Sequence, residues 1–388
     1  MGLKVSSRST VDAFRVMDVM RAAQDAENEG RAVYHLEVGQ PGTPAPRAAR
    51  DAVKQALDKQ TLGYTMALGM DDLREGISDL YQRWYGHALP PSQIAVTQGA
   101  SGAFALAFLT AFDAGDTVAL ATPGYPCYRN ILNALGLKSV EIMTGPETKY
   151  QPTVEALKAL PEPIDGLIIA SPSNPTGSML APNDFRAISD WCREQGVRLV
   201  SDEIYHGLTY GTPETTAVAI NPDAIVVNSF SKYFSMTGWR VGWLVMPEDM
   251  MRPLERLQGN MTICTPAVSQ IAALGALQAV DELEALKDGY RRNRAVLQQA
   301  LIDGGVTEIS APDGAFYFYA DVSHLTGDAV EFCTRILDET GIAITPGADF
   351  DTQRGQRFIR LSYCTDEQSV QTAAGLLTRW LRDQHKLI

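Results

Sequence analysis

The sequence has few of the residues that hold metals or form disulfides. Its 388 residues include only five cysteines and five histidines, and neither type recurs at the short spacings of a metal site or a CxxC pair. We therefore expect no bound metal. Scattered cysteines are also typical of proteins in the reducing cytoplasm, where we expect this chain to act.

Basic runs and long apolar runs are missing too. The chain has 33 Lys and Arg against 46 Asp and Glu, a net charge of −13, and such a surface repels nucleic acid and anionic membranes. No apolar stretch approaches the roughly 18 residues that span a membrane, and no apolar segment of a secretion signal follows the first residues. We expect neither nucleic acid nor a membrane as a partner.

The strongest chemical signal surrounds Lys232. Ser229 and Ser231 precede this lysine, and Arg240 follows it eight positions later. A lysine amine forms a Schiff base with an aldehyde, while hydroxyl groups and an arginine can neutralise a phosphate. The pattern therefore indicates a lysine that holds pyridoxal phosphate. Taken alone, it is more often a polar loop with a solvated lysine.

Two apolar runs that end in polar residues predict strands whose carboxyl ends meet a ligand. Residues 197–200 lead to Asp202, and residues 165–171 lead to a turn that contains Asn174. Ligands of open α/β sheets bind at the carboxyl ends of strands. There a carboxylate can keep a pyridine nitrogen protonated, and flanking prolines would hold the Asn174 amide rigidly. A helix N-cap and an ordinary turn are the structural alternatives.

A third predicted strand, residues 93–97, opens into small residues before an apolar helix at residues 103–112. These small residues are Gly99, Ala100 and Ser101. Backbone amides left free at a helix N-terminus form an anion site. Small residues at this position also serve close packing of a strand against a helix, so the signal is weak alone.

Strands and helices alternate from about residue 44 to residue 282, which predicts an α/β fold with a mostly parallel mixed sheet covered by helices. Expected strands at 316–319, 342–344 and 358–361 predict a second, smaller α/β unit. We therefore expect a large domain at 44–282 and a small domain made of 1–43 and 283–388. The spacing of Phe14, Met17 and Met20 predicts a first helix at about residues 11–28.

Together these segments resemble the class I and II aminotransferase family of fold type I pyridoxal-phosphate enzymes. The resemblance covers about residue 10 to the end and combines many separate motifs, so it is highly specific. The matching segments are Gly39-Gln40-Pro41, Tyr64 with Gly69 and Leu73-Arg74, Gly99-Ala100-Ser101, Pro123-Gly124-Tyr125-Pro126, Asn174-Pro175-Thr176-Gly177, Asp202-Glu203 with Tyr205, the residues around Lys232, and Phe358-Ile359-Arg360-Leu361-Ser362-Tyr363.

The resemblance implies an enzyme that moves an amino group from an L-amino acid to a 2-oxo acid with pyridoxal 5′-phosphate as cofactor. The catalytic residues would be Lys232, Asp202 and Tyr205. The implied cofactor-binding residues are Gly99, Ala100, Ser101, Tyr125, Asn174, Asp202, Tyr205, Ser229, Ser231, Lys232, Arg240 and, from the neighbouring subunit of a homodimer with shared active sites, Tyr64. The implied binding residues for the substrate α-carboxylate are Arg360, Gly39 and Asn174, with a surface position on a strand as the alternative for Arg360.

Two departures from the family pattern concern the substrate. Gly42-Thr43 follow Gly39-Gln40-Pro41 where many relatives carry an acidic or hydrophobic residue, which leaves the path of that loop open. Ser101 occupies the position where some aspartate-specific relatives place a lysine. No other motif nominates a cation for a second carboxylate, so a dicarboxylic donor is not supported.

Three other functions are compatible with parts of the sequence. The same scaffold serves a C–S lyase, a synthase or a decarboxylase, because the cofactor supplies the electron sink in each case. A nucleotide-dependent oxidoreductase is disfavoured, since the loop at residues 98–102 lacks GxGxxG spacing. A non-catalytic sensor of amines or pyridoxal phosphate would need a DNA-binding module, for which residues 1–40 offer a single helix and the chain an acidic charge.

Overall fold

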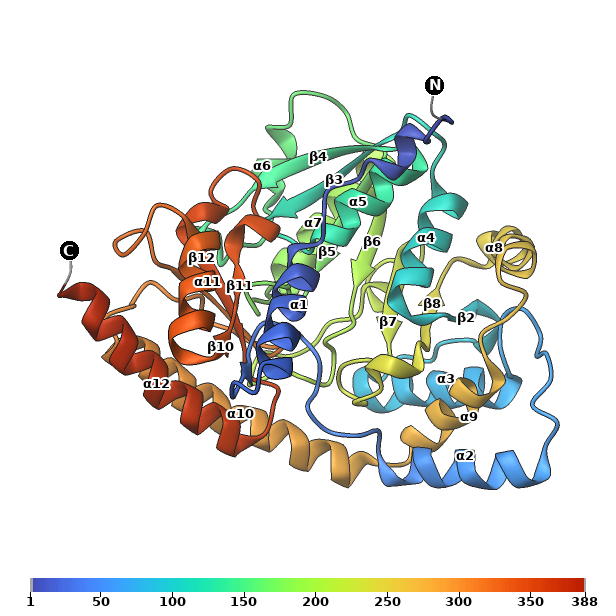
Figure 1. Ribbon diagram of the computed structural model, residues 1–388. Helices are drawn as coiled ribbons and strands as arrows, with labels where there is room; N and C mark the ends of the chain where they lie inside the picture. The colour runs from blue at the N-terminus through green and yellow to red at the C-terminus, as the bar shows by residue number, and fades with distance from the viewer. Residues whose placement is uncertain (1–2, 387–388) are drawn as a thin grey trace.

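A computed structural model describes residues 3–386 and shows a central seven-stranded sheet with helices on its faces (Figure 1). The strand order is β2 (Ile94–Thr97), β8 (Gly242–Val245), β7 (Ile225–Ser229), β6 (Arg198–Asp202), β5 (Gly166–Ala170), β3 (Thr117–Thr122) and β4 (Lys138–Met143). Strand β8 runs antiparallel to β2 and β7, and the other adjacent pairs of this sheet are parallel. The expected mostly parallel mixed sheet is confirmed, and its apolar strands are those of a sheet buried on both faces.

Among the described residues, eight α-helices belong to this unit. They are α2 (Arg47–Lys59), α3 (Asp71–Tyr85), α4 (Gly99–Ala111), α5 (Pro126–Leu135), α6 (Val154–Lys158), α7 (Pro182–Gln195), α8 (Glu248–Met261) and α9 (Ala267–Ala276), and α4 to α7 connect strands of the sheet. Local sequence explains several of their ends. Proline occupies the first position of α5 and α7, and both helices end at a left-handed glycine, Gly136 and Gly196.

A second unit combines both ends of the chain. The strand β1 (Tyr34–His35) pairs in parallel with β10 (Ile342–Ala343), and β12 (Phe358–Ser362) lies between β11 (Thr345–Pro346) and β9 (Tyr317–Asp321). The helices of this unit are α10 (Val280–Asp303), α11 (Ala329–Thr340) and α12 (Glu367–His385). The predicted domain boundary at residue 282 lies in the first turn of α10, and the domain bounds stay a prediction.

Helix α1 (Arg15–Asn28) contacts both units (Figure 1). Phe14 packs edge-on against Tyr125 of the large-sheet unit, and the amide of Arg15 donates to Asp349 of the other. The helix begins four residues later than the sequence predicted, because Phe14 has an extended backbone. Apolar spacing alone could not locate this start, since the partner that caps it is distant in sequence.

A single large apolar cluster joins the faces of both units. Residues of β2, β3, β5, β6, β7 and β8 contribute to it together with residues of β9 and β12. The polar ends of these strands are therefore held on a common rigid base. None of the helices within residues 3–386 is both long and apolar enough to cross a membrane.

Candidate active site

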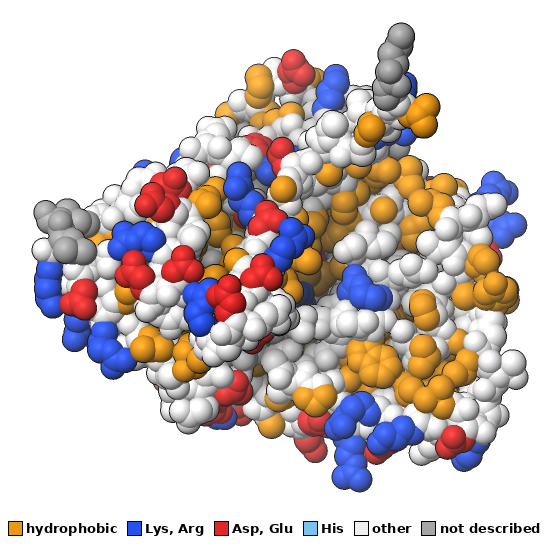
Figure 2. Space-filling model, in the orientation of Figure 1, with side chains coloured by type: hydrophobic (Ala, Val, Ile, Leu, Met, Phe, Trp, Pro, Cys, Tyr) orange, Lys and Arg blue, Asp and Glu red, His pale blue; other side chains and the backbone are white. Residues whose placement is uncertain are grey.

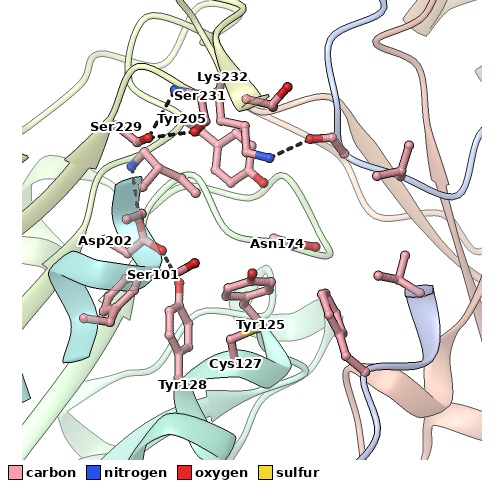
Figure 3. A pocket seen from close by; sticks show the side chains of 18 of the residues that line it. Ser101, Tyr125, Cys127, Tyr128, Asn174, Asp202, Tyr205, Ser229, Ser231 and Lys232 are labelled. Atoms are coloured by element: carbon pink, nitrogen blue, oxygen red, sulfur yellow. Dashed lines mark hydrogen bonds between the residues drawn. The ribbon is translucent and has the colours of Figure 1, made fainter. Parts of the chain in front are cut away.

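A pocket of about 190 Å³ lies where the carboxyl ends of β5, β6 and β7 face β12 and the start of α1 (Figure 3). It brings together most residues that the sequence nominated. These are Gly39, Ala100, Ser101, Tyr125, Asn174, Asp202, Tyr205, Ser229, Ser231, Lys232, Arg240 and Arg360. Gly99 lies directly behind this lining, whereas Tyr64 is on the surface with 83% exposure.

Lys232 follows β7 and points to the N-terminal segment. Its Nζ donates a hydrogen bond to the carbonyl oxygen of Gly39, 2.6 Å away. Burial lowers the pKa of Lys232 to about 8, and the cations Arg360 and Arg240 contribute in the same direction. About a tenth of this amine is therefore neutral at pH 7, far more than for a lysine of ordinary pKa, and the neutral form is the nucleophile for an aldehyde.

Asp202 ends β6 and is 3% exposed. One carboxylate oxygen accepts a hydrogen bond from the amide of Ile204 at 3.1 Å, and the other accepts from the hydroxyl of Tyr128. Burial raises the pKa of Asp202 to about 6, although both hydrogen bonds act against the rise. No α-helix follows Asp202 directly, so the N-cap alternative is wrong.

Tyr128 is a pocket residue that the sequence analysis missed. It lies on α5, three positions after Tyr125, and the two rings meet edge to face with centroids 5.3 Å apart. Residues three apart on a helix share a face. That spacing was the available signal, because Tyr125 was already expected to face the ligand.

A cradle for an anion lies at the start of α4. A Cβ atom on Gly99, whose φ is +69°, would lie 2.5 Å from Nη2 of Arg240, so only glycine allows this approach. The hydroxyl of Ser229 donates to the hydroxyl of Ser231 at 2.9 Å beside it. A guanidinium, hydroxyl groups and the amides of a helix N-terminus together favour a bound phosphate.

Arg360 is a buried cation in the middle of β12, 3% exposed, and the surface alternative is wrong. Its guanidinium donates to Oδ1 of Asn174 at 3.0 Å, to the carbonyl oxygen of Glu37, and to the hydroxyl of Thr345 at 3.3 Å. All three acceptors are uncharged atoms. Within the described range 3–386 Arg360 forms no ion pair, and its Nε has no hydrogen-bond partner.

Two aromatic rings hold Arg360 in place. The guanidinium carbon lies 4.5 Å from the ring centre of Tyr317 and 4.7 Å from that of Phe350. The Tyr317 hydroxyl is hydrogen-bonded to the Tyr205 hydroxyl at 2.8 Å. A Cβ atom on Gly39 would collide with the Tyr317 hydroxyl. The sequence predicts only that Tyr317 lies in a strand, because its contact with Arg360 depends on packing between distant segments.

Apolar residues form another wall of the pocket. They are Phe14, Val16, Met17, Met20 and Ile131, from the start of α1 and from α5. Apolar side chains gather around the hollow beside α1 in Figure 2. Among the described residues, the lysines and arginines that line the pocket are Lys232, Arg240 and Arg360.

The two departures from the family pattern have defined places. Ser235 donates to the carbonyl oxygen of Thr43 at 2.9 Å, and the two hydroxyls are 2.7 Å apart, so the Gly42-Thr43 loop is tied to the loop of Lys232. Ser101 lines the pocket without adding charge. In the part of the chain that the structure describes, no group of His, Cys, Asp or Glu is placed to hold a metal ion.

This arrangement suits a phosphorylated aromatic aldehyde together with an amino acid. It offers an amine for the aldehyde, an anion cradle for the phosphate, and a carboxylate of raised pKa for a ring nitrogen. An unpaired guanidinium remains for a further anion. Because Arg360 and the amine of Lys232 line the same pocket, one small carboxylic acid can reach both.

Comparisons with known proteins agree with this chemistry. The sequence model of a family described as "Aminotransferase class I and II" matches residues 31–377. A valine–pyruvate aminotransferase of Mycobacterium tuberculosis is 46% identical over 98% of this chain and 99% of its own length. A (5-formylfuran-3-yl)methyl phosphate transaminase of Methanocaldococcus jannaschii is 34% identical over 92% and 94%. A crystal structure of an aminotransferase from Mycobacterium tuberculosis superposes with a TM-score of 0.96, at 46% identity, over 98% of this chain and 100% of that one.

The raised pKa of Asp202 predicts how the ligand-free protein responds to pH. The folded state binds a proton more tightly than the unfolded state, whose pKa is 3.8. Stability therefore falls as pH rises from about 4 to about 6, and above that range Asp202 costs up to about 3 kcal/mol. We expect Asp202→Asn to stabilise the ligand-free protein near pH 7 in urea unfolding and to flatten this pH dependence.

Asp366 provides the control for this measurement. Hydrogen bonds at the start of α12 lower the pKa of Asp366, so Asp366→Asn should destabilise the protein near pH 7. If Asp202→Asn destabilised the ligand-free protein as Asp366→Asn does, the carboxylate of Asp202 would be an ordinary structural group.

Proposed function

The chain belongs to the class I and II aminotransferase family and transfers amino groups from L-amino acids to 2-oxo acids, and we propose that its amino donors carry a neutral, apolar side chain. The apolar wall of the pocket carries this proposal. The three cations of the lining are assigned to other groups: Lys232 to the cofactor aldehyde, Arg240 to its phosphate and Arg360 to the substrate α-carboxylate. The side-chain carboxylate of aspartate or glutamate would therefore find no cation. A relative named valine–pyruvate aminotransferase supports the same class of donor.

Enzymes of this family generally depend on pyridoxal 5′-phosphate, and the pocket fits that group. The guanidinium of Arg240 packs against Gly99 at the start of α4, and this contact supports a phosphate site there. When bound, the cofactor draws electrons away from the substrate Cα. We propose that the phosphate is held by Gly99, Ala100, Ser101, Ser229, Ser231 and Arg240, that the ring oxygen faces Asn174 and Tyr205, and that the ring nitrogen and ring face meet Asp202 and Tyr125.

Lys232 would attach the cofactor and then carry the proton of the substrate Cα. Both tasks need a neutral amine, and the lowered pKa of about 8 makes the neutral form easier to reach near neutral pH than it is for an ordinary lysine. The hydrogen bond to the carbonyl oxygen of Gly39 keeps the amine inside the pocket. Asp202 would keep a ring nitrogen protonated, because a buried carboxylate is stabilised by an adjacent cation.

Arg360 would bind the substrate α-carboxylate. Its charge is buried and lacks a counter-ion within residues 3–386, so a carboxylate supplies the missing partner, and the planar guanidinium can bind both oxygens at once. Asn174 already accepts from this guanidinium, and its amide nitrogen can donate to the same carboxylate. The backbone of Gly39 lines the pocket beside them.

The large domain at 44–282 would then hold the cofactor, and the small domain of 1–43 and 283–388 would present Arg360. Substrate that binds both draws the two domains together. The five free thiols support a location in the reducing cytoplasm.

A donor screen tests the proposed substrate class. Arg360→Lys keeps the charge but loses the two-point geometry, so it should weaken kcat/KM for every donor by a similar factor. That factor is about 10 to 150, which corresponds to the roughly 1.5–3 kcal/mol of a charge-assisted hydrogen bond. In the wild type, kcat/KM for valine should exceed kcat/KM for aspartate. The measurement is the amino-donor half-reaction for valine, leucine, alanine and aspartate.

Arg357→Lys is the matched control, because Arg357 is exposed and pairs with Asp321. It should leave all donors unchanged. Aspartate as the best donor would overturn the proposal, and selective weakening of one donor by Arg360→Lys would show that Arg360 is not a common carboxylate clamp.

We also propose that two copies of the chain form a homodimer with shared active sites. Tyr64 lies in a loop and is 83% exposed, and Met66 of the same loop is exposed too. Met261 at the end of α8 and Ile263 just after it are further exposed apolar residues. Buried Gln270 holds this surface together, since its amide donates to Thr65 and to the carbonyl oxygen of Thr265. An exposed apolar surface of this kind favours burial against a second copy.

Mixed dimers test the shared site. Lys232→Ala and Tyr64→Ala chains should each be impaired alone. After subunit exchange at equal concentrations, about a quarter of the wild-type activity should return, because half the dimers are mixed and each has one intact site. A mixture of two Lys232→Ala preparations is the control. Proven exchange without recovery would contradict the shared site.

A further inference from the structure

Asp349 is a buried carboxylate that lies outside the pocket lining but touches the helix that forms the apolar wall. It ends a short 3-10 turn, Gly347–Asp349, directly after β11, and is 3% exposed. One of its oxygens accepts from the amide of Arg15 at 3.0 Å, and the other accepts from the amide of Val16 at 3.2 Å. More than 300 residues of chain separate these partners.

These two hydrogen bonds replace the cap that α1 lacks. The residue before the helix is Phe14, whose side chain makes no capping hydrogen bond. The first amides of a helix have no partner within the helix, and a carboxylate there also complements the helix dipole. Asp349 therefore determines where α1 starts and how its first turn is oriented.

The same first turns supply the apolar wall of the pocket. Phe14, Val16, Met17 and Met20 all line it, and Phe14 packs edge-on against Tyr125 with ring centroids 6.0 Å apart. Met17 is 50% exposed, so its packing against the protein holds it only in part. The position of this wall depends on the anchor at the helix start.

The residue next to Asp349 contacts the proposed carboxylate clamp. The Phe350 ring lies 4.7 Å from the guanidinium carbon of Arg360, and the Phe350 carbonyl oxygen accepts from the amide of Gly124 at 3.0 Å, next to Tyr125. Two consecutive residues thus connect the apolar wall, Arg360 and the segment of Tyr125. This dipeptide therefore contacts both the start of the wall and Arg360.

We propose that Asp349 is a positioning residue for donor selection, which fixes the apolar wall of α1 at the distance from Arg360 that favours a branched aliphatic side chain over a methyl group. This inference rests on the proposed preference for neutral, apolar donors. A donor held by its carboxylate at Arg360 reaches the wall only with a side chain of sufficient size. Alanine, with its methyl group, depends less on the wall.

Hydrogen exchange tests the anchor itself without any activity. Asp349→Ala should speed exchange of the Arg15 and Val16 amides by about tenfold or more, as expected when a helix cap is lost. Asp349→Asn keeps one acceptor oxygen, so its amide exchange rates should lie between those of the wild type and those of Asp349→Ala. Unchanged exchange at both amides in Asp349→Ala would overturn the proposal at its first step.

The donor ratio tests the role in selection. In Asp349→Ala the ratio of kcat/KM for valine to kcat/KM for alanine should fall about tenfold. The fall should come from a higher KM for valine, while kcat at saturating valine stays within about twofold of the wild-type value. Asp349→Asn should show a smaller fall, which keeps the test valid if the alanine variant folds poorly. A wild-type ratio in both variants would make Asp349 merely structural.

Asp328→Ala is the matched control, because Asp328 caps α11 by accepting from the amides of Val330 and Glu331. It should lower stability without changing the donor ratio. A double-mutant cycle with Met20→Ala adds a second check. Met20→Ala should lower the ratio in the wild type and add little in Asp349→Ala, whereas full additivity would contradict an effect through the wall.

The two proposals fail differently. A wild-type enzyme that prefers aspartate overturns the proposed donor class, whatever Asp349 does. A wild-type enzyme that prefers valine, with a ratio unaffected by Asp349→Ala, overturns only the role of Asp349.

Discussion

Burial of charge without a counter-ion is the constraint on which the site depends. Arg360, Asp202 and Lys232 are largely buried, and none forms an ion pair with another described residue. Such burial costs free energy unless a partner is supplied. The shifted pKa values of Asp202 and Lys232 express that cost. A carboxylate, a ring nitrogen and an aldehyde are the groups that would relieve it, and the cofactor and substrate of an aminotransferase carry them.

Hydrogen bonds to uncharged atoms hold the side chains of Arg360 and Lys232 in place in the ligand-free protein. Arg360 donates to Asn174, to the backbone of Glu37 and to Thr345, and Lys232 donates to the backbone of Gly39. The acceptors come from the large sheet, the N-terminal segment and the small sheet. Folding of both units is therefore required before the site exists, and the shared apolar core provides the free energy for it.

Local sequence signals located the fold and much of the pocket. Apolar runs followed by Asp202 or Asn174 mark strand ends, and a strand end fixes where a side chain lies in an α/β sheet. Contacts between distant segments could not be predicted this way. The cap that Asp349 provides for α1 and the hydrogen bond between Tyr317 and Tyr205 depend on packing that no local spacing encodes. The role of Tyr64 stays a prediction, because it depends on a second chain.

The proposed attachment of the cofactor to Lys232 can be tested most directly. Borohydride reduction of the enzyme loaded with pyridoxal 5′-phosphate makes a lysine–cofactor bond permanent, and peptide mapping by mass spectrometry identifies the lysine. We predict that the label lies on the peptide containing Lys232 and disappears in Lys232→Ala, which should remain folded. A label on any other lysine, or an unlabelled protein that still transfers amino groups, would contradict the account.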